Sequence, residues 1–180
     1  MTATTTPTST RTPSPTPGNV ALALLPAAGL SGGRACVALQ LTGKGQTVAA
    51  AAVQLALPAG IALSSCTINP LIGAGTAADK ELVISEPAAG ARRIEVGGSP
   101  APLGDGTLLS CQLAIDAGAA VAAYDLAAVF ESWDVGGGAL TTDGSDTALV
   151  VTNCNGDCDG SGAVAIGEVV RALNLFAGSP

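Results

Sequence analysis

The feature that most constrains the fold is a series of short apolar or alternating runs between Asn19 and Asn153, separated by turn-forming residues. The turn signals are GKG at Gly43, PAG at Pro58, GDG at Gly104 and DGS at Asp143. Short runs with turns at this spacing predict an all-β sandwich. The nine expected strands cover residues 20–25, 35–42, 47–57, 61–65, 81–85, 92–96, 107–115, 124–133 and 147–152.

The alanine-rich run 47–57 is the one segment that helix propensity alone would assign differently. GKGQT precedes it and PAG follows it, and these two turn signals favour a strand that belongs to a hairpin unit. We therefore expect a strand here.

The composition narrows the possible functions. A net charge of -7 without a basic cluster argues against nucleic acid or an anionic membrane as partner. No apolar run is long enough to span a bilayer. The chain has no histidine, which excludes Ser-His and Cys-His catalysis. Carboxylates occur, but most alternate with apolar residues or flank turns, as on solvated strand faces; they are Glu81, Glu86, Glu95, Asp125, Glu131 and Asp134. We expect no enzyme.

Aromatic side chains are scarce, and three of them lie in one segment. Tyr124 and Phe130 have the same parity in the expected strand 124–133, whereas Trp133 has the opposite parity unless a bulge intervenes. Core packing is the expected role of Tyr124 and Phe130. An exposed aromatic row, which polysaccharide binding would need, is not evident.

The first eighteen residues form a separate region, with ten Ser or Thr, four Pro and no apolar periodicity. Such a segment favours an extended, partly polyproline II stalk. It is either a surface spacer with O-linked sugars or a bare linker. It lacks the apolar stretch of a secretory signal, so an export signal would lie upstream or would already have been removed.

Residues 157–168 carry oxygen atoms at the spacing of a calcium loop. Such a loop needs ligands at positions 1, 3 and 5, glycine at 6, a backbone carbonyl at 7 and a bidentate carboxylate at 12. Counting from Asp157, Gly162 fills position 6, and the Ca²⁺ ligands are Asp157, Asp159, Ser161, Ala163 and Glu168. A frame that starts at Asn155 would place Ile166 at position 12. The alternative is an acidic turn without metal.

The loop is preceded by VVTNCNG, which is not helical, and is followed by one expected helix over 165–176. A loop with a single following helix resembles one dockerin repeat, although dockerins normally carry two. The preceding region resembles a cohesin module, the nine-stranded jelly-roll sandwich that receives dockerins. The motifs of that resemblance are GKGQTV, LPAGIAL, CTINP, DGTLLSCQLAI and TTDGSDTALVV. The resemblance implies a cohesin-like sandwich at 19–152 and a dockerin-like half repeat at 153–180, after the stalk or linker at 1–18 that the composition indicates.

Five cysteines without histidine or a C-x-x-C pair argue against zinc and favour disulfides in an exported protein. Cys66 and Cys111 lie in strand regions that could be neighbours, and Cys154 and Cys158 flank NGD before the calcium loop. Cys36 would then remain as a buried thiol. The alternative is five unpaired cysteines.

The family resemblance implies a noncatalytic adhesive protein, extracellular or on a cell surface. The leading hypothesis is head-to-tail self-association into a filament or surface layer, in which a calcium-ordered segment or the strand 19–25 of one copy joins the sandwich of another. The alternatives are a scaffold module that recruits a separate dockerin-bearing partner, and a carbohydrate-binding module that holds polysaccharide through Trp133.

Overall fold

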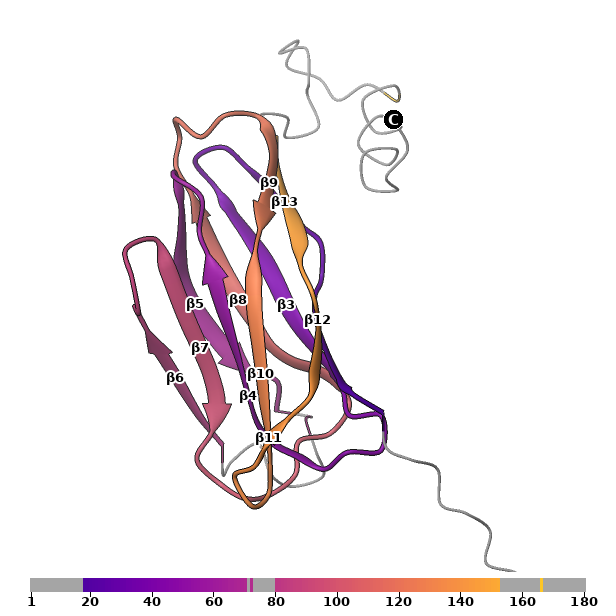
Figure 1. The fold of residues 1–180 in the computed structure, drawn as a ribbon. Helices are drawn as coiled ribbons and strands as arrows, with labels where there is room; N and C mark the ends of the chain where they lie inside the picture. The colour runs from indigo at the N-terminus through magenta and orange to yellow at the C-terminus, as the bar shows by residue number, and fades with distance from the viewer. Residues whose placement is uncertain (1–17, 71, 73–79, 153–165, 167–180) are drawn as a thin grey trace, which may run out of the picture.

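The computed structural model describes residues 18–70, 72, 80–152 and 166, and within them the chain forms β-strands almost throughout (Figure 1). The strands are β1 (Val20–Leu24), β2 (Ala27–Leu30), β3 (Arg34–Thr42), β4 (Val48–Ala56), β5 (Ile61–Ile68), β6 (Glu81–Ser85), β7 (Ala91–Gly97), β8 (Gly106–Ile115), β9 (Ala122–Leu126), β10 (Ala128–Asp134), β11 (Ala139–Leu140), β12 (Thr142–Ser145) and β13 (Thr147–Thr152). No helix in the described ranges is long and apolar enough to cross a membrane.

The strands form two five-stranded sheets and one of three strands. Sheet I has the order β12-β1-β3-β8-β5, sheet II has the order β11-β10-β4-β7-β6, and sheet III has the order β2-β13-β9. Strands that are close in sequence often belong to different sheets. The chain therefore forms a sandwich, as the turn spacing predicted.

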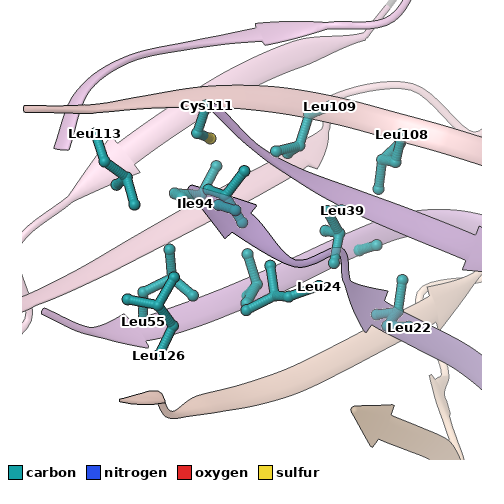
Figure 2. Packing of buried hydrophobic residues seen from close by; sticks show 14 of the residues in the cluster. Leu22, Leu24, Leu39, Leu55, Ile94, Leu108, Leu109, Cys111, Leu113 and Leu126 are labelled. Atoms are coloured by element: carbon teal, nitrogen blue, oxygen red, sulfur yellow. The ribbon is translucent and has the colours of Figure 1, made fainter. Parts of the chain in front are cut away.

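Period-two alternation determines which side chains enter the core. In β3 the residues Ala35, Val37, Leu39 and Leu41 are buried and their neighbours alternate outward. From the other sheet, Leu55 and Ile94 enter the same core, opposite Leu39 and Leu113 (Figure 2). Each fully buried aliphatic side chain of this kind stabilises the fold by roughly 1.5–3 kcal/mol.

The expected segment 124–133 is two strands. β9 pairs with β13 in sheet III, whereas β10 pairs with β4 in sheet II, so the chain changes sheet at Ala127. The described part of the chain has thirteen strands, whereas nine were expected. The difference is this division into two strands and the three short strands β2, β11 and β12.

β4 is a strand, as predicted, but it is not part of a hairpin with its sequence neighbours. It pairs with β10 and β7, while β3 and β5 lie in sheet I. The flanking turns therefore carry the chain between sheets. β1 is also not an open edge, because it pairs with β12 on one side and β3 on the other. The expected sharing of this strand between copies is thus wrong for the chain as folded here.

Candidate docking face

The outer face of sheet II is the side turned away from the core, and strand register defines its members. Because partners in register share a face, this face carries three residues from each of four strands. They are Glu81, Val83 and Ser85 of β6, Arg93, Glu95 and Gly97 of β7, Ala50, Ala52 and Gln54 of β4, and Val129, Glu131 and Trp133 of β10.

An ion pair crosses the middle of this face. Arg93 Nη2 lies 2.6 Å from Glu131 Oε2, and Arg93 Nε lies 3.5 Å from Glu95 Oε2. Arg93 and Glu131 belong to β7 and β10, which flank β4 on opposite sides. The pKa of the Arg93 guanidinium is raised, chiefly by its hydrogen bond to Glu131. The two carboxylates hold the guanidinium in one place over the sheet.

Small side chains on β4 leave room for this ion pair. Ala52 lies between Glu95 and Glu131 in the register, and it alternates with the inward-facing residues Ala51 and Val53. Although Ala52 points away from the core, it is only 1% exposed. The ion pair spanning β4 accounts for this burial. A longer side chain at position 52 would have to displace the ion pair.

Apolar and aromatic groups border the ion pair. The guanidinium carbon of Arg93 lies 5.9 Å from the centroid of the Trp133 ring, within the range of a cation–π contact. Val83 on β6 is 52% exposed, and Val129 on β10 is 61% exposed. Arginine and tryptophan are enriched at the energetic centres of protein interfaces, where apolar neighbours exclude water around them. The face therefore has the composition of a protein-docking surface.

A shallow open depression of about 470 Å³ lies at the Trp133 end of this face. Its walls include Ala50, Pro100, Trp133 and Val135, with the carboxylate-bearing residues Glu95 and Asp134. Asp134 Oδ1 accepts hydrogen bonds from the backbone N–H groups of Gly136 and Gly138, which shape the turn after β10. The depression extends the outer face of sheet II toward the loops.

The outer face of sheet I has a different character. By alternation, β3 and β8 turn short or polar side chains outward there, including Arg34, Cys36, Gln40 and Gln112. Within the described part of the chain, the exposed large hydrophobic residues do not include any member of this face. Sheet II is therefore the better candidate for docking.

Cys66 and Cys111 form a disulfide between β5 and β8, with an S–S distance of 2.00 Å, as the sequence predicted. The expectation for Cys36 is wrong: its thiol is exposed. Cys36 occupies an outward position of β3, between the buried residues Ala35 and Val37. The alternation in the sequence A-C-V-A-L already indicates that Cys36 points outward.

The remaining predicted site residues lie outside the described residues. These are the expected calcium ligands Asp157, Asp159, Ser161, Ala163 and Glu168 and the disulfide candidates Cys154 and Cys158. Most of segment 1–18 also lies outside. Among the residues that the structure describes, no group of three or more His, Cys, Asp or Glu could hold a metal ion.

The three aromatic residues lie as the strand parity predicted, with Trp133 on the face opposite to Phe130. Tyr124 and Phe130 pack against the core from different strands, β9 and β10. Trp133 lies on the outer face of sheet II, just before a register shift in the pairing of β10 with β4. Glu95 and Glu131 were expected to be solvated, but both contact Arg93. That contact depends on strand order, which no local pattern reveals.

No family model matches the chain, and no curated protein matches it in sequence. Its fold is similar to that of a non-cellulosomal cohesin from the hyperthermophilic archaeon Archaeoglobus fulgidus, with 12% identity, a TM-score of 0.58 and coverage of 75% of this chain and 92% of that chain. It is also similar to CaCohA2 from Clostridium acetobutylicum, with 16% identity, a TM-score of 0.63 and coverage of 74% and 91%.

A third similar structure is the sixth cohesin from the scaffoldin B of Acetivibrio cellulolyticus, solved in complex with a mutant Cel5 dockerin. It is 12% identical, with a TM-score of 0.61, and the match covers 75% of this chain and all of that chain (100%). At such identities the likeness establishes the fold. The described part of the chain is a cohesin-type jelly-roll sandwich.

Proposed function

We propose that this chain is a noncatalytic docking module that assembles proteins through the outer face of sheet II. The observation that carries the proposal is the grouping of Arg93, Trp133, Val83 and Val129 on one open sheet face. A fixed guanidinium, an aromatic ring and exposed valines supply charge-assisted hydrogen bonding and apolar burial together. The cohesin-type fold supports the same reading, since one similar structure is a complex with a dockerin.

The partner that the chain itself offers is the dockerin-like segment 153–180 of another copy. In this proposal Asp157, Asp159, Ser161, Ala163 and Glu168 bind Ca²⁺ and order that segment for docking. A receptor face and a ligand segment on one chain form a heterologous contact, which propagates into a filament or surface layer unless a ring closes. The alternative partner is a separate dockerin-bearing protein, bound at one to one.

The proposed location is extracellular or on a cell surface. The Cys66–Cys111 disulfide supports this location, because disulfides persist mainly in oxidising compartments. The Thr/Ser/Pro-rich segment at the start of the chain would act there as a spacer.

Analytical ultracentrifugation of the full chain, with calcium and with a chelator, tests the proposal. Assembly in calcium should be lost on chelation and on Val129→Asp, which places a charge on the docking face. Val121→Asp is the matched control, because Val121 is 56% exposed and lies outside sheet II, just before β9. A chain that stays monomeric at high concentration in calcium would contradict self-association. Capture of a foreign dockerin at one to one would support the alternative partner.

Polysaccharide binding is the second candidate function, because Trp133 lines an open depression beside two carboxylate-bearing residues. Sugars stack on such rings and bond to such carboxylates. Retention on a polysaccharide column that disappears in Trp133→Ala but persists in Val129→Asp would favour it over protein docking.

A further inference from the structure

The depression beside Trp133 is acidic. Glu95 and Asp134 line it, and Glu81 lies against Gly98, another of its wall residues. The nearby cation Arg93 is already engaged by Glu131 and Glu95. A ligand of this depression would therefore gain from carrying a positive charge.

The apolar part of the depression suits an extended, proline-rich segment. The Trp133 ring, Pro100 and Val135 form its walls, with glycines at several other positions. Val135 is 50% exposed, so its apolar surface is available to a ligand. Aromatic-lined grooves recognise polyproline II segments, whose backbone loses little entropy on binding.

The chain contains a segment of this chemistry. Residues 1–17 include four prolines, Arg11 is their one charged side chain, and none of them is acidic. The segment is thus complementary in charge to the depression. Its composition also matches the polyproline II ligands of aromatic grooves.

This segment starts from the same end of the sandwich as the depression. Gly18 N donates to Lys44 O at 3.1 Å, and Gln46 Nε2 donates to Gly18 O at 3.3 Å. Gln46 precedes Val48 by two residues, and Val48 pairs with the depression residue Asp134. Two residues of extended chain span about 7 Å. In Figure 1 the start of β1 and the β10–β11 turn lie at the same end of the molecule.

We propose that residues 1–17 dock in the depression of their own chain, with prolines against Trp133 and Arg11 near Glu95 and Asp134. Seventeen residues in polyproline II conformation reach about 53 Å, and Arg11 reaches about 22 Å from Gly18. Docking in cis is therefore within reach. It places a second ligand site at one end of the docking face and does not depend on the partner that the face receives.

Trp133 is the only tryptophan of the chain, so its fluorescence reports on this site alone. The test measures the acrylamide quenching of Trp133 fluorescence in the full chain. The protein is at a low concentration and a chelator is present. The wild type is compared with Arg11→Glu and with Pro13→Gly/Pro15→Gly. Arg11→Glu should weaken docking about threefold, the size typical of one exposed ion pair. Both variants should raise the quenching of Trp133.

The matched control is Arg34→Glu, because Arg34 lies on β3 of sheet I, away from the depression, and hydrogen-bonds Gln112. This variant should quench as the wild type does. Equal quenching in the wild type and both tail variants would overturn the proposal. Protection of Trp133 from acrylamide that increases with protein concentration would also overturn the proposal, because residues 1–17 of a second copy would then occupy the depression. The assembly test with Val129→Asp is independent of either result.

Discussion

Removing the Cys66–Cys111 disulfide should lower the free energy of unfolding by about 4 kcal/mol. The bond joins β5 to β8, and the two cysteines are 45 residues apart in sequence. Opening a closed loop of this length returns about 13 cal/mol/K of entropy to the unfolded chain, which is about 4 kcal/mol at room temperature. Cys111 is 1% exposed, so the matched double variant is Cys66→Ala/Cys111→Ala, which avoids a buried polar group.

Urea unfolding followed by Trp133 fluorescence measures this loss. Cys36→Ala is the control, because Cys36 is an exposed, unpaired thiol on the neighbouring strand β3. It should change the free energy of unfolding by less than about 0.5 kcal/mol. A double variant as stable as the wild type would refute the reasoning that this disulfide restrains the unfolded chain.

Three further changes probe the sandwich and its C-terminal segment. Lys80→Met should cost roughly 3 kcal/mol in urea unfolding, because the buried ammonium of Lys80 donates to three backbone carbonyls, at 2.7, 2.6 and 2.5 Å; an unchanged midpoint would contradict this role. Gly144→Ala should lower the melting temperature, since its methyl group would overlap the Phe130 ring, and should cost about 1–3 kcal/mol; a melting temperature equal to that of the wild type would count against this packing. Glu168→Gln should weaken calcium binding in calorimetry, because it removes the bidentate ligand of the proposed loop. The absence of a calcium response in the wild type would refute the proposal that residues 157–168 form a calcium loop.

The local sequence pattern was sufficient to predict the position and the buried residues of a strand where that strand stays in one sheet. The buried residues of β3 and β8 follow period-two alternation, and the turn signals place both strands correctly. Alternation failed at Ala127, because β9 and β10 continue the same apolar pattern while pairing in different sheets. The short strands β2 and β12 were missed because glycine and small side chains give them no strong β propensity.

The arrangement of the outer face of sheet II could not be predicted from the sequence, for a related reason. Arg93 and Glu131 are 38 positions apart, and they meet only because β4 lies between β7 and β10. The solvation of Glu131 was expected from its alternation with apolar residues, whereas no expectation covered Arg93. Their pairing requires strand order and register, which depend on the whole sandwich. The same is true of Trp133, whose position over the ion pair depends on the register of β10 against β4.

Oxidative footprinting of side chains, on the assembled and the dissociated chain, tests the docking face most directly. We predict that calcium-dependent assembly protects Val83 and Val129, while Val121, whose exposure is between theirs, stays as reactive as in the monomer. Protection of Val121, or of Cys36 on sheet I, with no change at Val83 and Val129 would contradict the assignment of the outer face of sheet II as the surface that receives the partner.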